Sequence, residues 1–299
     1  MFFARWKGTA MVLALAFVLA ASCGRERSVH ATATALDDFG DTIVVSAPAT
    51  RIVSLNPVTT EMLFAMGEGR RVIGRTHFDL YPESARTVPD LGDGIQPNVE
   101  AVLGARPDLV ILYASNANRG AAARLRRAGI TTLAIHTDQV ADVRRAARLL
   151  SIAVGDTAAG TRLADSVERS LRVVSARPRP EKPPTVFWLI WETPIYTIGG
   201  GSYLSELVEA AGARNVFGDL SAPGPQVTME EVVRRNPDYI LAGPVGAAHI
   251  RAANAWRAVP AAHAGRILVV DTTLVGRPGV RIGEAARYLR ALILHDTVP

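Results

Sequence analysis

The chain has 299 residues, of which 48% are hydrophobic and 20% are charged, and this composition excludes collagen-like, disordered and polytopic membrane proteins. Its length is sufficient for two domains, each with its own hydrophobic core. The net charge of +5 does not predict a nucleic-acid-binding protein, because two positive charges are Arg5 and Lys7 and the other arginines are scattered among acidic residues.

Residues 1–22 have the pattern of an export signal. Arg5 and Lys7 precede an uncharged apolar stretch at residues 11–21, which is too short to span a membrane as a mature helix. We therefore expect this signal peptide to be removed. The mature protein is then expected in the cell envelope, on the periplasmic or extracytoplasmic side.

Cys23 is the only cysteine of the chain and directly follows the export signal. Residues 19–23 resemble the lipobox of bacterial lipoproteins, which implies cleavage before Cys23 and attachment of a lipid to its thiol. The lipid would anchor the mature protein to a membrane surface. Residues 23–36 are mostly small and polar, so we expect a flexible tether between the anchor and the folded part.

Residues 37–155 are predicted to form an N-terminal α/β lobe. Short runs rich in β-branched and aliphatic residues alternate here with segments of helical character. Such alternation favours a mostly parallel sheet covered by helices. The expected strands are residues 43–45, 52–55, 72–73, 109–113 and 131–135, and the expected helices are residues 59–66 and 121–128.

A second α/β lobe is predicted for residues 178–299. Before it, Leu163, Val167 and Val174 recur at helical spacing, which predicts a connecting helix at residues 156–177 that ends at a run of prolines. The expected strands of the second lobe are residues 186–191, 239–241 and 267–270, and its expected helices are residues 204–211 and 281–294.

The two predicted lobes share an internal repeat. Residues 98–111 align without gaps on residues 228–241, at a constant offset of 130 residues. Each copy begins with a capping residue, has Glu100 or Glu230 in its first helical turn, and passes through Pro-Asp into a buried strand. From the repeat alone, the two glutamates either stabilise helix N-termini or share a function at the surface.

Several catalytic and metal-binding motifs are absent from the sequence. The glycines at residues 199–201 lie where a phosphate-binding loop would begin, but no lysine follows them, so a tight turn is an equally good interpretation. There is no Gly-x-Ser-x-Gly motif, and the six histidines show no zinc-binding spacing. We therefore expect no catalytic residues, no bound metal ion and no resident cofactor.

Aromatic and polar residues follow several predicted strands, where α/β sheets bind ligands. His77 lies in the loop after residues 72–73 and is either a ligand-binding or an ordinary surface histidine. Arg277 lies in a loop shaped by glycine and proline, where its guanidinium either binds an anionic ligand or is solvated. The aromatic residues that could line a cleft between the lobes are Phe78, Tyr113, Trp188, Trp191 and Tyr196.

Several blocks of the sequence resemble those of envelope substrate-binding proteins of the ABC importers for cobalamin, haem and ferric siderophores. The blocks are residues 51–57 with Thr60 and Glu61, residues 98–111, residues 212–217 and residues 256–267, within a match that spans residues 38–294. The resemblance implies two Rossmann-like lobes joined by a single long α-helix, the class III periplasmic binding protein fold. It also implies a monomer without catalytic activity that delivers a metal-chelate ligand to a permease dimer with its ATPase.

The resemblance assigns a role to the repeated glutamates. In this family an exposed glutamate on each lobe contacts arginines of the permease, and these positions fall on Glu100 and Glu230. Two exposed carboxylates on opposite lobes would fix the orientation of the protein on a two-fold symmetric permease.

Cobalamin or a related corrinoid is the ligand that the resemblance favours. The blocks are most similar to those of cobalamin-binding members, whose cleft aromatics fall on Phe78, Tyr113 and Tyr196. Gly94 and Gly224 occupy positions where tryptophan is expected, which implies a wider pocket or a different ligand.

Other ligands and other classes of protein stay open at this point. A ferric siderophore would use Arg75 and Arg277 against its anionic oxygens, and haem would use His77 or Tyr113 as an iron ligand. The alternatives of another class are an envelope enzyme on a similar scaffold and a tethered signalling module without a permease.

Overall fold

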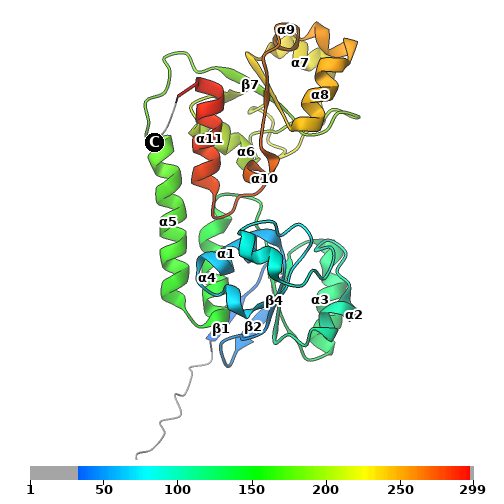
Figure 1. The fold of residues 1–299 in the computed structure, drawn as a ribbon, viewed down its shortest axis with the longest axis vertical. Helices are drawn as coiled ribbons and strands as arrows, with labels where there is room; N and C mark the ends of the chain where they lie inside the picture. The colour runs from blue at the N-terminus through cyan, green and yellow to red at the C-terminus, as the bar shows by residue number, and fades with distance from the viewer. Residues whose placement is uncertain (1–32, 297–299) are drawn as a thin grey trace, which may run out of the picture.

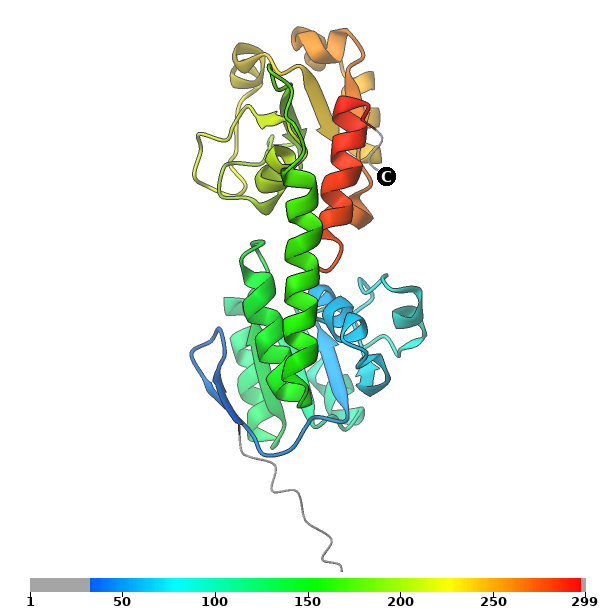
Figure 2. The ribbon, with the colours of Figure 1, turned by 90° about the vertical axis from the view of Figure 1, so that its left-hand side faces the viewer.

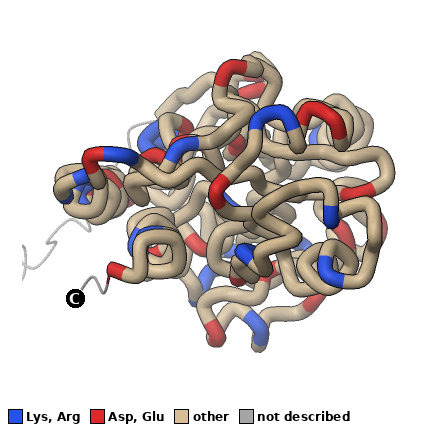
Figure 3. The backbone as a smooth tube through the Cα atoms, turned by 90° about the horizontal axis from the view of Figure 1, so that it is seen from above, with Lys and Arg blue, Asp and Glu red and all other residues tan. Residues whose placement is uncertain are grey.

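The computed structural model describes residues 33–296, which form two α/β lobes joined by one long helix (Figure 1). The predicted export signal and the predicted lipid attachment at Cys23 lie outside the described residues. Within residues 33–296, no helix is both long enough and apolar enough to cross a membrane. Basic and acidic residues are interspersed over the view in Figure 3.

The N-terminal lobe contains a parallel sheet with strand order β4-β3-β5-β6. Alternate side chains of the central strands enter two separate apolar clusters, because helices α1 and α4 cover one face and α2 and α3 the other (Figure 1). The strands are β3 (Ile52–Leu55), β4 (Val72–Gly74), β5 (Leu109–Tyr113) and β6 (Thr131–Ile135). The helices are α1 (Pro57–Ala65), α2 (Val99–Gly104), α3 (Arg119–Arg127) and α4 (Asp142–Val154), with 3₁₀ turns at Gly69–Arg71, Glu83–Thr87 and Asn116–Asn118.

Residues 33–36 form a strand, which corrects the prediction that the flexible tether extends to residue 36. Strand β1 (Ala33–Leu36) pairs antiparallel with β2 (Thr42–Val45). The buried carboxylate of Asp37 accepts hydrogen bonds from the backbone amides of Phe39 and Asp41 in the turn and of Ala134 in β6. These contacts stabilise the strand. The small and polar residues around it gave no sign of them in the sequence.

The C-terminal lobe repeats this plan with strand order β8-β7-β9-β10, again parallel. The strands are β7 (Thr185–Leu189), β8 (Arg214–Asn215), β9 (Tyr239–Ala242) and β10 (Ile267–Val269). The helices are α6 (Tyr203–Ala210), α7 (Met229–Arg235), α8 (Pro244–Ala252), α9 (Pro260–His263), α10 (Thr272–Val275) and α11 (Ile282–Leu294), with a 3₁₀ turn at Asn254–Ala258.

The internal repeat is also a structural repeat. Arg106 and Asn236, which are 130 residues apart, both have positive φ, at 49° and 44°. Asp108 accepts hydrogen bonds from the backbone and hydroxyl of Thr50 before β3, and Asp238 accepts the same pair from Thr185 at the start of β7. The Pro-Asp of each copy therefore connects the helix–strand unit to the neighbouring central strand.

Helix α5 (Thr157–Ser175) connects the two lobes. Asp156 caps its N-terminus, because the side chain of Asp156 accepts from the amide of Ala159. It packs against α4 of the N-terminal lobe and α11 of the C-terminal lobe, and Figure 2 shows it running along both. The apolar residues that predicted the helix, including Leu163, Val167 and Val174, are buried in this contact.

Candidate ligand-binding cleft

The carboxyl ends of the strands of the N-terminal sheet face a cavity of about 780 Å³ between the lobes, which we call the interlobe pocket. Residues that follow strands form one wall, among them Asn56 after β3, Thr76 after β4 and Thr137 after β6. Tyr203 and residues 276–278 of the C-terminal lobe form the opposite wall. Open α/β sheets bind ligands at this edge, so the interlobe pocket is the candidate site.

Tyr113 lies on the wall of the interlobe pocket at the end of β5. Its hydroxyl donates a 2.6 Å hydrogen bond to Asp138, and its ring makes an edge contact with His136, with centroids 5.8 Å apart. Burial and the adjacent Asp138 carboxylate raise the pKa of Tyr113, so its hydroxyl stays protonated. A protonated and occupied hydroxyl is a poor ligand for haem iron, which tyrosine binds as tyrosinate.

Phe78 also lines the interlobe pocket, and its ring is 47% exposed. The ring of neighbouring His77 packs against it with centroids 4.1 Å apart, but His77 does not line the pocket. The structure therefore brings Phe78 and Tyr113 together, and it leaves His77 outside as an exposed residue of the same loop.

Arg75 does not line the interlobe pocket, as it would have to do in order to bind the anionic oxygens of a ferric siderophore. Its guanidinium donates hydrogen bonds to the backbone carbonyls of Thr76 at 2.7 Å and Arg86 at 3.2 Å. Its side chain is 12% exposed. These contacts give Arg75 a structural role in holding the loop between β4 and residues 83–87.

Arg277 lines the interlobe pocket but also connects the two lobes. One terminal nitrogen donates a 2.7 Å hydrogen bond to the carbonyl of Phe78, and the other lies 3.6 Å from Oε1 of Glu61. Arg281 of the same lobe lies 3.8 Å from the same oxygen. The guanidinium of Arg277 is thus held in place by contacts across the boundary between the lobes.

Tyr196 does not lie on the wall of the interlobe pocket. It pairs with Trp191 and Gln226 in short antiparallel bridges beyond the end of β7, and its side chain is 37% exposed. The aromatic residue that the C-terminal lobe does place on the wall is Tyr203, whose hydroxyl donates a 2.9 Å hydrogen bond to the carbonyl of Val275.

A second hollow of about 540 Å³ lies at the carboxyl ends of β7 and β9, and we call it the C-lobe hollow. Strand β7 ends at Leu189, two residues before the predicted end, so Ile190 and Trp191 leave the sheet and are 49% and 63% exposed. Glu192 and His249 also line this hollow. At the repeat offset of 130, residue 243 is equivalent to residue 113. The repeat could therefore have predicted that the loop after β9 holds the same place in its lobe as the loop after β5.

The two glycines at expected tryptophan positions have different environments. A Cβ atom on Gly94 would lie 2.2 Å from the carbonyl oxygen of Leu55, so the close backbone approach requires glycine there. A Cβ atom on Gly224 would meet only the carbonyl oxygen of Thr197, at 4.0 Å. Gly94 is therefore part of the packed wall, whereas Gly224 leaves open space.

The glycine-rich loop at residues 199–201 is a packed turn. The amides of Gly199 and Gly200 donate to the carbonyls of Pro223 and Leu220, and the carbonyl of Gly201 accepts a 2.7 Å hydrogen bond from Gln139 of the other lobe. The amides of Gly199 and Gly200 are therefore occupied and not available to a phosphate. No cluster of three or more His, Cys, Asp or Glu side chains in residues 33–296 could hold a metal ion.

Glu100 and Glu230 are exposed in the first turns of α2 and α7, one on each lobe. Both helices lie on the side of the molecule away from α5 (Figure 1). Glu100 forms an ion pair with Arg124. Its own backbone amide and the Arg124 guanidinium lower the pKa of Glu100, so its carboxylate stays ionised. The side chains of Asn98 and Thr228 cap the two helices by accepting from the amides of Ala101 and Glu231, so neither glutamate is needed as a cap.

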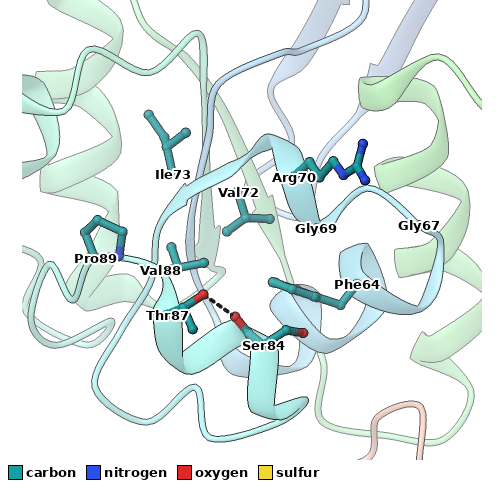
Figure 4. A pocket seen from close by; sticks show the side chains of 10 residues that line it. All are labelled: Phe64, Gly67, Gly69, Arg70, Val72, Ile73, Ser84, Thr87, Val88 and Pro89. Atoms are coloured by element: carbon teal, nitrogen blue, oxygen red, sulfur yellow. Dashed lines mark hydrogen bonds between the residues drawn. The ribbon is translucent and has the colours of Figure 1, made fainter.

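A further hollow of about 670 Å³ lies beside the edge strand β4 (Figure 4). Phe64 of α1 and residues 67–73 and 84–89 form its walls, and Thr87 donates a hydrogen bond to the carbonyl of Ser84 within it. All of these residues belong to the N-terminal lobe, so this hollow is separate from the interlobe pocket.

Comparison with known proteins places this architecture in a known group. The profile of the family described as "Periplasmic binding protein" matches residues 52–274. The uncharacterized ABC transporter substrate-binding lipoprotein YvrC of Bacillus subtilis (strain 168) is 29% identical, and the alignment covers 95% of this chain and 96% of the relative.

Two solved structures are similar in fold and in sequence. The periplasmic vitamin B12-binding protein BtuF of Vibrio cholerae has a TM-score of 0.70 and 25% identity, covering 83% of this chain and 98% of that protein. The periplasmic heme-binding protein RhuT of Roseiflexus sp. RS-1 has a TM-score of 0.73 and 26% identity, with the same coverage of 83% and 98%. These likenesses confirm the predicted class III periplasmic binding protein fold.

Proposed function

Because this chain belongs to the periplasmic binding protein family and is a substrate-binding protein of an ABC importer, we propose that it captures cobalamin or a related corrinoid in the interlobe pocket. Phe78 and Tyr113 would contact the macrocycle from the N-terminal lobe, and Tyr203 would replace Tyr196 as the aromatic residue of the opposite wall. The vitamin B12-binding protein of Vibrio cholerae supports this ligand.

The charge of the cleft is the observation that carries the choice of ligand. Asp93 and Asp138 place two carboxylates on the wall of the interlobe pocket, and Glu192 places a third in the C-lobe hollow. Arg277 places a positive charge in the same pocket as the two aspartates, and its guanidinium donates to the carbonyl of Phe78. Two carboxylates against one guanidinium favour a ligand with a neutral periphery, such as cobalamin with its amides, over a polyanionic chelate such as a catecholate ferric siderophore.

The permease is proposed to dock on the face that carries Glu100 and Glu230. Both carboxylates are exposed, they lie on different lobes, and they occupy equivalent places in the internal repeat. Arginines of a permease would replace Arg124 as the partner of Glu100 and would pair with Glu230. Exposed charges of this kind set the encounter rate and the register of a complex.

The protein is proposed to be a monomeric lipoprotein on the extracytoplasmic face of a membrane, anchored by a lipid on Cys23 after signal cleavage. The proposal rests on residues 1–23 of the sequence and on the relative YvrC, which is named a lipoprotein. Since the matched family and the similar structures are binding proteins, we also propose that the chain has no catalytic activity.

Calorimetric titration of the purified protein tests the ligand directly. We expect saturable one-to-one binding of cyanocobalamin with a Kd of about 1 μM or tighter, which corresponds to about −8 kcal/mol. A catecholate ferric siderophore serves as the anionic control and should not bind. Binding of a siderophore without binding of cyanocobalamin would contradict the proposal.

Haem is the second candidate, because the heme-binding protein RhuT is as similar to this chain as the vitamin B12-binding protein is. Neither predicted iron ligand supports it, since His77 does not line the interlobe pocket and the hydroxyl of Tyr113 is held by Asp138. The same titration with haem distinguishes the two ligands.

A further inference from the structure

The C-lobe hollow contains a histidine whose partner is already in place. Nδ1 of His249 lies 3.2 Å from Oε2 of Glu192, and Oε1 of Glu192 accepts a 2.9 Å hydrogen bond from the indole nitrogen of Trp256. Trp256 is 1% exposed and belongs to the core of the lobe. A buried indole therefore fixes the carboxylate, and the carboxylate orients the imidazole at the wall of the hollow.

This arrangement determines which nitrogen of His249 can bind a ligand. A carboxylate beside Nδ1 keeps the proton on that nitrogen, so the lone pair stays on Nε2. Within residues 33–296, no side chain or backbone group is hydrogen-bonded to Nε2 of His249. Metal-ligating histidines in proteins commonly have this same form, with the second nitrogen donating to a carboxylate.

The surroundings suit a metal that arrives inside a planar chelate. A macrocycle fills the equatorial positions of its metal, so one protein nitrogen is sufficient for an axial bond. Trp191 and Val245, which are 63% and 70% exposed, give the C-lobe hollow an apolar wall for the face of a macrocycle.

The C-lobe hollow and the interlobe pocket are neighbours. Thr272 lines the C-lobe hollow and Gly276 lines the interlobe pocket, and they stand at the two ends of helix α10 (Thr272–Val275). At 1.5 Å per residue, this helix separates them by about 6 Å. A corrin ring is wider than this spacing, which is a requirement for one bound ligand to reach both hollows.

We propose that His249 is an axial ligand of the cobalt of a bound corrinoid, with Glu192 as its positioning residue. The inference rests on the proposed function and adds a preference for corrinoids that carry an exchangeable axial water. In the exchange, the bond between Co(III) and the water oxygen breaks and a bond to Nε2 forms. The water leaves with its electron pair, and cobalt keeps its oxidation state.

Aquocobalamin and cyanocobalamin test the inference on the purified full chain, because only the first has an axial water to exchange. We expect the visible absorption spectrum of aquocobalamin to change on binding, and that of cyanocobalamin to stay the same. In His249→Ala the spectral change disappears. The affinity for aquocobalamin falls about tenfold or more, and it falls by a larger factor than the affinity for cyanocobalamin, because only aquocobalamin loses the bond to Nε2.

Two further variants separate coordination from structure. Glu192→Gln removes the carboxylate that orients the imidazole, so aquocobalamin binds about tenfold more weakly but with the same final spectrum. His263→Ala removes an exposed histidine that lines neither the C-lobe hollow nor the interlobe pocket, and it leaves both affinities and both spectra unchanged.

The outcomes distinguish this inference from the proposed function. Equal binding of both corrinoids without a spectral change overturns the role of His249 and leaves the proposed function intact. A spectral change that persists in His249→Ala, or that is lost in His77→Ala instead, also overturns it. Failure of both corrinoids to bind, with or without binding of ferric haem, overturns both proposals.

Discussion

Glu61 places a nearly buried carboxylate at the junction of the two lobes. Its side chain is 3% exposed, and its closest cations, Arg277 and Arg281, come from the other lobe at 3.6 and 3.8 Å. Burial raises the pKa of Glu61 above its usual value of 4.5, and the two guanidinium groups offset only part of this effect. The loss of hydration therefore outweighs the ion pairs, as is common for buried salt bridges.

The raised pKa makes the stability of the protein depend on pH. Between pH 4.5 and the raised value, folded Glu61 holds a proton that the unfolded chain has released. The free energy of unfolding of the wild type therefore falls, relative to that of Glu61→Gln, as the pH rises from about 4 to 7. Denaturant titrations at several pH values measure this difference, with the exposed Glu284→Gln as a control. A difference that is independent of pH would contradict the prediction.

The residues of the binding site could be predicted only in part. Sequence reasoning about strand ends and about the glycine- and proline-shaped loop at residues 275–279 singled out Phe78, Tyr113 and Arg277, and all three line the interlobe pocket. It could not show which way each side chain points, because tertiary contacts decide this. Arg75, for example, has the right position in the chain but turns to backbone carbonyls.

Tertiary contacts also explain why some residues of the site were identified only by the structure. Asp138 and His249 gain their positions from a tyrosine 25 residues away and a glutamate 57 residues away. No spacing rule for catalytic or zinc-binding residues connects these partners, so a search for such motifs passes over them. The exposed positions of Glu100 and Glu230, which are proposed to dock on the permease, were easier to predict, because the internal repeat marks both.

At the scale of elements, the buried side chain of Asp37 helps to hold the hairpin of β1 and β2 on the sheet. The carboxylate of Asp37 is buried and accepts from the amides of Phe39, Asp41 and Ala134, and Arg126 lies 3.3 Å away. A buried donor without an acceptor costs about 1–3 kcal/mol. Asp38 adds a second attachment, because its amide donates to the carbonyl of Ala134 and its carboxylate accepts from the amide of His136.

We expect Asp37→Ala to lower the free energy of unfolding by about 2–4 kcal/mol, because at least two backbone amides lose their acceptor. Urea denaturation measures the effect, and protease resistance near residues 33–45 reports whether the hairpin has detached. Thr34→Ala, at an exposed position of β1, should change the free energy of unfolding by less than about 0.5 kcal/mol. Equal stability of both variants would show that Asp37 does not hold the hairpin.

Most elements could be predicted because their signals are local. The central strands are continuous aliphatic runs, and α5 and α11 have long apolar faces. Helix α4 was not predicted, although Val143, Ala146, Ala147 and Leu150 have helical spacing, because alanine gives this pattern little contrast. The two-residue strand β8 has no pattern of its own and exists through its pairing with β7.

At the scale of the whole molecule, several contacts hold the lobes in one arrangement. Helix α5 packs on both lobes, Gln139 donates to the carbonyl of Gly201, and Arg277 donates to the carbonyl of Phe78, both at 2.7 Å. A molecule connected in this way undergoes only small changes on binding. The distance between the two exposed glutamates is then nearly fixed, which is what recognition of a two-fold symmetric permease requires.

This fixed arrangement leads to a prediction for docking. Glu100→Ala and Glu230→Ala should each weaken binding to the permease by about tenfold, and the double variant by about 100-fold, because distant sites act additively. Binding to the permease in lipid vesicles measures this, and it should weaken as salt is raised. The Kd for the ligand should not change, because neither glutamate lines the interlobe pocket or the C-lobe hollow. Glu284→Ala, in the first turn of α11, is the matched control and should dock normally. Loss of ligand affinity in either single variant would contradict the docking role.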